Sequence, residues 1–287
     1  MFAMKQSTIL ISVIIPHRDS VGTLPRLISS IPNDPRIEII IVDNSINQLS
    51  VDDIPPHDNI RLYNSDYDKY AGGARNVGLQ HATGRWLLFA DADDYYTTEA
   101  FDLFLRNIDM VQDILYTGMT GWNDTTNEYC SRGEIYADLV RGYLTGGVTE
   151  EALRYLFHSP CCKMIRKEIV DKNNIRFSEV RFGNDALFSV QTGHYARSIK
   201  ASDTITYVAT LSNNNITRKT DFSAVRCRFT EDLKINRFLR RNKQRQWQLP
   251  IWPTIRPYGI RKRISLLALA IRYGQPLMVD HYTKINF

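Results

Sequence analysis

The sequence predicts an α/β protein with a mostly parallel central sheet, helices on both sides of it and a helical C-terminal extension. Short runs of β-branched residues, such as 9–16 and 37–42, alternate with segments of helical character, which is the order of βαβ units. Of the 287 residues, 43% are hydrophobic and 23% are charged, as in an ordinary globular protein. This composition excludes a disordered or collagen-like chain.

The elements of the first half follow from their local patterns. The run 9–16 ends at Pro16 and has no polar alternation, so it predicts a strand that is buried on both faces. By the same criteria we expect strands at 37–42, 60–63 and 86–90, and helices at 23–31, 70–82 and 98–108. The second half is less regular, and there we expect strands at 113–121, 163–165 and 205–209, helices at 150–157, 167–173, 184–196, 222–239 and 261–273, and a polar loop at 213–215.

Three polar clusters directly follow predicted strands, at 16–19, 43–45 and 91–94. Ligands of open α/β sheets bind outside the carboxyl ends of the strands, so we expect the clusters to converge on one crevice. The last cluster places Asp91, Asp93 and Asp94 within four residues, where like charges repel unless a cation compensates them. Carboxylates suit Mg²⁺ or Mn²⁺, which also bind phosphates. For Asp94, capping of the following helix is an equally good interpretation.

Four segments, in this order and spacing, resemble the family 2 glycosyltransferases, which have the GT-A fold: ISVIIPHRD at 11–19, IEIIIVDNS at 37–45, AGGARNVGL at 71–79 and ATGRWLLFADADD at 82–94. The resemblance is detailed over 10–105, weaker through 183–188, and fades after 217. It implies transfer of a sugar, with inversion, from a nucleotide-sugar that is usually UDP-linked to an acceptor hydroxyl, with Mn²⁺ or Mg²⁺ as the cofactor.

The resemblance also implies roles for single residues. It places Pro16 and His17 where the first strand meets the nucleotide, Asp43 where an acidic residue recognises uracil, and Arg75 where a basic residue approaches the nucleotide. It makes 91–93 the DXD motif: Asp91 faces the ribose or the metal, Ala92 lies between the two acids, and Asp93 binds the metal that bridges the diphosphate. Arg18 departs from the family pattern, and pairing with a phosphate or with a surface carboxylate are both open.

Asp185 matches the Asp of the family's Glu-Asp pair, which is usually interpreted as the general base. An inverting displacement needs one carboxylate to accept the proton of the acceptor hydroxyl. Here the preceding residue is Asn184, so the Glu is missing, and this could alter the pKa of Asp185 or its contact with the acceptor. The alternative interpretation of Asp185 is the N-cap of a helix at 186–196.

The net charge of +5 conceals an asymmetry. Residues 1–225 hold 22 Lys and Arg against 28 Asp and Glu, whereas residues 226–263 hold 12 basic residues and 2 acidic ones. This segment also carries aromatic residues, at 229, 238, 247, 252 and 258, and fits a peripheral contact of 226–273 with an anionic membrane. The alternative is a solvated helical face whose apolar side packs on the body. No motif for nucleic acid binding is present.

We divide the chain into a GT-A domain at 1–217 and a basic helical extension at 218–287. Residues 1–110 would bind the nucleotide-sugar and 111–217 the acceptor. Apolar runs are too short to span a bilayer, no secretory h-region is present, and the four Cys form no CxxC, so we expect a cytoplasmic protein, peripheral on the inner face of the plasma membrane. The resemblance further suggests synthesis of a bacterial surface polysaccharide, such as capsule or O-antigen, on a polyprenyl-diphosphate-linked acceptor.

The sequence also allows other functions and other sites. A nucleotidyltransferase that makes nucleotide-sugars would need a Gly-rich phosphate loop after the first strand, which 16–19 does not provide. A sugar-nucleotide-binding protein with impaired catalysis is suggested by Asn184. Cys161 and Cys162 beside His158 could form a thiol site, although buried packing is the better interpretation. Trp122 and Tyr143 could line an acceptor pocket or belong to the core.

Overall fold

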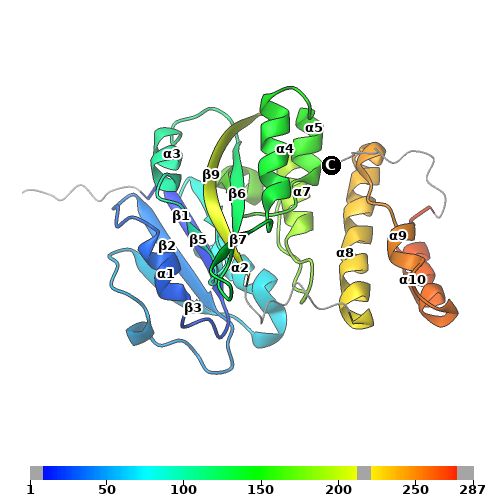
Figure 1. Ribbon diagram of the computed structural model, residues 1–287, viewed down its shortest axis with the longest axis horizontal. Coiled ribbons are helices and arrows are strands. Elements are labelled where there is room, and N and C mark those ends of the chain that lie inside the picture. The colour runs from blue at the N-terminus through cyan, green and yellow to red at the C-terminus, as the bar shows by residue number, and fades with distance from the viewer. Residues whose placement is uncertain (1–8, 212–220, 277–287) are drawn as a thin grey trace, which may run out of the picture.

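The computed structural model describes residues 9–211 and 221–276, and Figure 1 shows their arrangement. Within these residues one nine-stranded sheet runs in the order β3-β2-β1-β4-β8-β6-β9-β5, with β7 paired to β6. The predicted loop at 213–215 and the predicted domain boundary between 217 and 218 lie outside the described residues.

The first half of the chain forms the parallel part of the sheet. Its strands are β1 (Ile11–His17), β2 (Ile37–Asp43), β3 (Ile60–Asn64) and β4 (Trp86–Phe89), and all three pairings between them are parallel. Every residue of β1 and β2 is buried, as their Ile- and Val-rich runs predict, and the two polar residues within the runs, Ser12 and Glu38, hydrogen-bond to each other at 2.6 Å. The register sets His17 beside Asp43, so the polar clusters do end at one edge of the sheet.

The second half makes the sheet mixed rather than mostly parallel. It adds β5 (Tyr95–Tyr96), β6 (Ile114–Asn123), β7 (Glu128–Cys130), β8 (Lys163–Arg166) and β9 (Ile199–Leu211). Only β6 and β9 pair in parallel, while β8 lies antiparallel to both β4 and β6. β9 is much longer than the predicted 205–209, because its register with β6 shifts around Gly118 and pairing resumes beyond that irregularity.

Helices cover the sheet on both sides (Figure 1). They are α1 (Leu24–Ser29), α2 (Tyr70–His81), α3 (Ala100–Arg106), α4 (Glu134–Leu144), α5 (Glu150–Leu156), α6 (Lys167–Lys172), α7 (Ala186–Tyr195), α8 (Phe222–Arg241), α9 (Trp252–Ile255) and α10 (Ile260–Arg272). Short 3-10 turns occupy Val51–Asp53, Tyr67–Lys69 and Arg245–Trp247. The helices predicted from sequence are all present, with ends shifted by a few residues. α4 is absent from the predicted elements, although Ile135, Leu139, Val140 and Tyr143 recur at helical spacing; its N-cap is Gly133, which makes no side-chain cap bond.

The C-terminal helices are attached to the body through α8. One side of α8 packs Ile235 and Leu239 against Tyr155 of α5 and Val190 of α7. A different side joins α9 and α10 in a second apolar cluster, made of Phe229, Leu233, Ile251, Ile255, Leu266 and Ala270. Figure 1 shows α9 and α10 beyond α8, at the end of the molecule opposite β3. Among the described residues, no helix is both long and apolar enough to cross a bilayer.

Candidate active site

The acidic turn after β4 is held in place by β9. The backbone N–H of Asp94 donates to the carbonyl of Asp91 at 3.0 Å, which closes the turn. The Asp94 carboxylate is buried and accepts the backbone N–H of Thr210 at 2.7 Å and the hydroxyl of Tyr207 at 2.9 Å. Capping of the next helix by Asp94 is therefore wrong, because α3 begins after Glu99 and Asp94 binds β9 instead.

This geometry leaves Asp91 and Asp93 just beyond the carboxyl end of β4. Both are partly exposed, and the carbonyl of Asp93 is fixed by Arg26 Nη2 and Thr210 Oγ1, each at 2.7 Å. Burial and the neighbouring Asp91 raise the pKa of Asp93, and burial together with Asp93 and Asp91 raises that of Asp94 well above its usual range. Full ionisation of the three carboxylates is therefore unfavourable in this structure, and a bound cation would offset their repulsion.

The donor set suits a hard cation that is held together with a phosphorylated ligand. In the part of the chain that the structure describes, no three His, Cys, Asp or Glu side chains converge on one point that could hold a metal. Mg²⁺ in nucleotide sites commonly takes only one or two carboxylates and completes its shell with phosphate oxygens and water. Asp91 and Asp93 offer that set, so the residues present fit the predicted metal.

Arg75 connects this turn to a distant part of the chain. Its guanidinium lies on α2 and is buried, with its side chain 5% exposed. Nη1 donates to Asn184 Oδ1 at 2.8 Å, and Nη2 donates to Asp91 Oδ1 at 2.5 Å. The structure therefore brings together three of the positions singled out in the sequence, at the junction between the two halves of the chain.

Asp185 lies beside this junction, one residue before α7. It occupies the N-cap position of α7 without the usual side-chain capping bond, although hydrogen bonds from the backbone N–H groups of Asp185 and Ala186 to its carboxylate act to lower its pKa. Burial raises the pKa of Asp185, the charge of Asp91 adds to the rise, and Arg75 opposes it. A carboxylate with a raised pKa is a stronger proton acceptor near neutral pH.

Two contacts with α2 hold the segment 176–185 that carries Asn184 and Asp185. The side-chain amide of Asn76 donates to the carbonyl of Phe177 at 3.0 Å and accepts its N–H at 2.9 Å. A Cβ on Gly72 would lie 2.0 Å from the carbonyl oxygen of Ser178, so only glycine permits this approach. Sequence reasoning assigned no role to Asn76 or Gly72, because neither contact has a local signal.

His17 and Asp43 form a buried pair at the ends of β1 and β2. His17 Nε2 accepts the N–H of Ser20 at 3.2 Å, so Nδ1 carries the proton and donates to Asp43 Oδ1 at 2.9 Å. Asp43 also accepts the N–H and hydroxyl of Ser45 and the N–H of Leu49. Burial raises the pKa of Asp43, but these hydrogen bonds outweigh it and leave the pKa below its ordinary value. Uracil recognition by Asp43 remains a prediction; its carboxylate is already engaged by four donors of its own chain.

Among the described residues Arg18 forms no ion pair with a carboxylate, and its pairing with a phosphate stays a prediction. Its guanidinium lies 4.1 Å from the ring centroid of Tyr67 and donates to the carbonyl of the same residue. The ring of Tyr70 lies 5.3 Å away. Arg18 thus attaches the end of β1 to the loop that leads into α2. Pro16, its neighbour in β1, is buried in the register opposite Val42.

The remaining candidate residues from the sequence are buried or partly buried. Cys161 and Cys162 are buried, and burial raises the pKa of both thiols, which agrees with packing rather than a reactive thiol site. Burial lowers the pKa of His158 to about 4, and its Nε2 contacts the carbonyl of Tyr155 at 3.0 Å. Trp122 lies in β6 and Tyr143 in α4, both partly buried.

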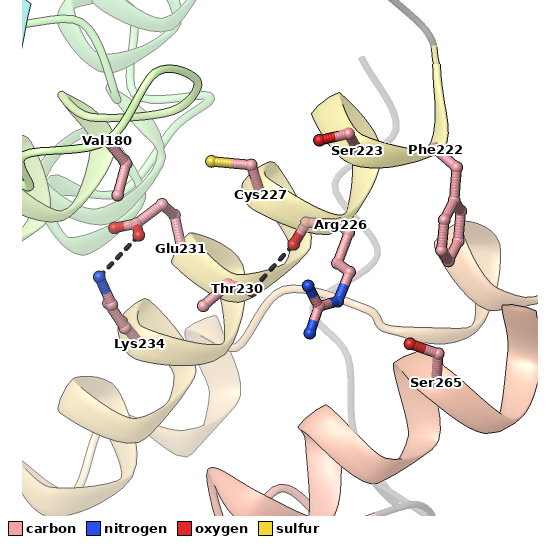
Figure 2. Close-up of a pocket in the computed structure, with 9 residues that line it drawn as sticks. All are labelled: Val180, Phe222, Ser223, Arg226, Cys227, Thr230, Glu231, Lys234 and Ser265. Carbon is pink, nitrogen blue, oxygen red and sulfur yellow. Dashed lines mark hydrogen bonds and ion pairs between the residues drawn. The ribbon is translucent and has the colours of Figure 1, made fainter. Parts of the chain in front are cut away.

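A groove of about 600 Å³ lies between α8, α10 and the segment that carries Asp185. It is lined by α8, by Ser265 of α10 and by Val180, and none of the predicted site residues lines it. Figure 2 shows Arg226 directed from α8 toward α10, and Lys234 paired with Glu231 at 2.7 Å. Glu231 is buried and lies against Gly183, two residues before Asp185. The groove and the segment 176–185 therefore share a wall.

The fold and the site define a glycosyltransferase of the GT-A type, and the comparisons agree. The family model for glycosyl transferase family 2 matches residues 12–173, and the chain belongs to this family. The solved structure of Staphylococcus aureus TarS 1–349 in complex with UDP superposes with a TM-score of 0.65 at 21% identity, covering 92% of this chain and 80% of that one. The same fragment in complex with UDP-GlcNAc gives a TM-score of 0.65 at 20% identity, covering 92% of this chain and 81% of that one.

Two curated relatives are similar over part of their length. Poly(ribitol-phosphate) beta-N-acetylglucosaminyltransferase TarS from Staphylococcus aureus (strain Mu50) is 26% identical over 69% of this chain and 35% of its own. UDP-Glc:alpha-D-GlcNAc-diphosphoundecaprenol beta-1,3-glucosyltransferase WfaP from Escherichia coli is 36% identical over 31% of this chain and 37% of its own. The chain thus spans a little over a third of the length of these relatives.

Proposed function

We propose that this protein transfers a sugar from a UDP-sugar, with inversion, to a hydroxyl of a glycan acceptor during synthesis of a bacterial surface polysaccharide. The observation that carries the proposal is the Arg75 bridge, because it joins Asp91 on the donor side to the Asn184-Asp185 segment on the acceptor side. The names of the relatives support it: TarS structures contain UDP or UDP-GlcNAc, and WfaP is named for a UDP-glucose donor and a polyprenyl-diphosphate acceptor.

On the donor side, the acidic turn and the ends of β1 and β2 would hold the nucleotide. Asp91 and Asp93 would hold Mn²⁺ or Mg²⁺, which supplies charge neutralisation for the leaving diphosphate. Arg75 keeps Asp91 oriented. His17 and Asp43 would shape the loop 44–49 around the base, since their carboxylate–imidazole pair anchors that loop to the sheet.

On the acceptor side, we assign the general base to Asp185. The acceptor oxygen forms a bond to the anomeric carbon as the bond from that carbon to the diphosphate oxygen breaks. The hydroxyl proton passes to the Asp185 carboxylate, and UDP leaves with the electron pair of the broken bond. The raised pKa of Asp185 suits this step, because the proton acceptor should have a pKa closer to the working pH than a free Asp has.

The glycan acceptor would reach Asp185 along the groove beside α8. Hydroxyls, charged groups and Phe222 line this groove, and sugars are bound by such combinations of polar groups and aromatic faces. Arg226→Ala should raise the KM for the acceptor while leaving metal-dependent hydrolysis of the donor unchanged. An unchanged acceptor KM would remove the groove from the acceptor path.

We also propose that the C-terminal extension keeps the enzyme on the inner membrane face, near a lipid-linked acceptor.

The donor assignment is tested by thermal stabilisation with UDP-, GDP- and dTDP-sugars, with and without Mn²⁺, because a ligand that binds the native state raises the melting temperature. We expect a UDP-sugar preference that needs the metal, and loss of the metal effect in Asp93→Asn. Asp185→Asn is the matched control, which should bind the donor normally but release little UDP. A preference for GDP-sugars would overturn the donor class, and metal-independent binding would overturn the role of the acidic turn.

A further inference from the structure

The outer face of α10 carries an apolar stripe that nothing in the described structure covers. Ile260, Ile264 and Ile271 are 75%, 60% and 67% exposed. With 3.6 residues per turn, positions four and seven apart fall on one side of a helix, so the three side chains lie in a single row along α10. The opposite side of the helix is the one that packs, through Leu266 and Ala270, against α8 and α9.

Cations flank this stripe, and α10 itself carries no acid to oppose them. α10 contains four basic residues and no acidic residue over its 13 residues. Arg261 and Arg272 are exposed and follow Ile260 and Ile271 directly, so they border the same side of the stripe. Arg263 is also exposed and lies near the other border, where its guanidinium donates to the carbonyls of Arg256 and Tyr258. Lys262 is exposed too, but it lies away from the stripe, with Nζ 5.0 Å from the ring centroid of Phe222.

We propose that this face of α10 docks on an anionic bilayer surface, with the three isoleucines in the headgroup–acyl boundary and the arginines on lipid phosphates. This inference rests on the membrane contact proposed above for the C-terminal extension, and it assigns that contact to one face of α10. An apolar stripe bordered by exposed Arg is the arrangement of helices that lie in the membrane interface. α10 is the last described helix and is at the end of the molecule, with the sheet on the far side of α8 (Figure 1).

The structure also narrows the contact. Of the aromatic residues that the sequence suggested for the interface, Phe229 and Trp247 are buried at 1% and 9% exposure within the helical clusters, whereas Trp252 is 38% exposed. Docking of a second copy through the same stripe is disfavoured, because a two-fold contact would set the arginines of one copy against those of the other. An anionic lipid surface complements the same charges.

The experiment is vesicle flotation of the full chain with phosphatidylcholine alone and with added phosphatidylglycerol, at low and high salt. We expect binding only with phosphatidylglycerol, and about a tenfold loss or more for the triple variant Ile260→Ser, Ile264→Ser, Ile271→Ser, because the transfer of apolar side chains is removed. Arg261→Gln with Arg272→Gln should weaken binding mainly at low salt. Val111→Ser is the matched control, since Val111 is 80% exposed but lies before β6.

Two outcomes would overturn the proposal. Equal vesicle binding by the triple variant and by wild type would place the contact elsewhere. Self-association of the wild type that the triple variant abolishes, without vesicle binding, would show that the stripe is an interface between copies. Donor hydrolysis in solution should be the same in all these variants, so a failure of the membrane proposal is distinct from a failure of the proposed transferase activity.

Discussion

Arg75 donates to Asn184 Oδ1 at 2.8 Å across 109 residues of sequence, and its other Nη atom binds Asp91. Asn184 is the position where the resembled family has Glu. A neutral amide here satisfies one hydrogen bond of the guanidinium but does not neutralise its charge. Among the described residues, Arg75 therefore forms an ion pair with one carboxylate, that of Asp91. Its positive charge also acts on Asp185, where it lowers the pKa and so opposes the rise that burial causes.

The variant Asn184→Glu should shift the pH dependence of the enzyme. A carboxylate at 184 would pair with Arg75 and place a like charge beside Asp185, so both effects raise the pKa of Asp185 further. We expect the acidic limb of kcat/KM to move to higher pH by on the order of one unit. The pH profile of metal-dependent UDP release measures it, with Asn184→Gln as the uncharged control. A limb that stays in place in Asn184→Glu would show that Arg75 does not tune Asp185.

Asp185→Asn should abolish transfer without weakening the binding of UDP. Loss of a general base costs about 10²–10⁴-fold in rate. The amide is nearly isosteric with the carboxyl, and its oxygen can still accept from the backbone N–H of Ala186, as the carboxylate does. Single-turnover rates and UDP affinity, measured on the same preparation, separate the two effects. Transfer within a few-fold of wild type would assign the base to another residue.

The same variant should raise the stability of the protein at neutral pH. The pKa of Asp185 is raised by burial in the folded state, so the folded protein binds this proton more tightly than the unfolded chain does. Its contribution to stability is therefore greatest below the ordinary Asp pKa and falls as pH rises through the folded pKa. Asp185→Asn removes that cost. We expect a higher Tm than wild type at neutral pH and no gain in acid, where both side chains are neutral.

The sequence predicted the elements whose signal is local. The buried runs of β1 and β2 are recognisable because most of their positions are Ile or Val, and the polar residues at and after their ends mark the edge where the predicted site residues lie. The resemblance to the family then singled out Asp91, Asp93, Arg75 and Asp185, and the structure brings Arg75, Asp91 and the 184–185 segment together. Their individual roles in binding and catalysis stay predictions.

What the sequence could not show depends on contacts between distant residues. Tyr207 and Thr210 hold the acidic turn from β9, more than 110 residues further along the chain, and nothing in the local pattern of a strand marks such a role. The two-residue strand β5 and the four-residue helix α9 are too short for periodicity to reveal. The C-terminal aromatics were expected at a surface, yet Phe229 fills the cluster between α8 and α10.

Gly72→Ala should displace the segment that carries Asp185. Its new methyl group would lie 2.0 Å from Ser178 O, a backbone atom that cannot rotate away, so 176–185 must move off α2. We expect a loss of about 1–3 kcal/mol in stability, as for overpacked sites, and a fall in transfer rate larger than the fall in donor affinity. Gly22→Ala is the matched control, because nothing lies within 4 Å of a Cβ at that position. Equal effects at both glycines would show that Gly72 is not needed to position the segment 176–185 against α2.

Lys163 should make the protein more stable as pH rises above neutral. Its side chain is fully buried beneath the site, where Nζ donates to the carbonyl of Phe157 at 2.7 Å and lies 4.6 Å from the ring centroid of the same residue. Burial lowers its pKa to about 7, although Cys162, Cys161 and Asp185 favour the charged form. The unfolded chain keeps this proton up to about pH 10.4, so between these values it binds more protons than the folded state.

By linkage, the free energy of unfolding then increases with pH from about 7 upward, by at most about 1.4 kcal/mol per pH unit from this group. Lys163→Met keeps the length of the side chain and removes the charge, so its stability should lack that slope and exceed the wild type most at and below neutral pH. Denaturant titrations at several pH values between neutral and pH 9 measure the difference, with Lys172→Met on the exposed side of α6 as the control. Parallel curves for wild type and Lys163→Met would show that Lys163 is charged throughout, and that the contact with Phe157 and the neighbouring rings compensates its burial.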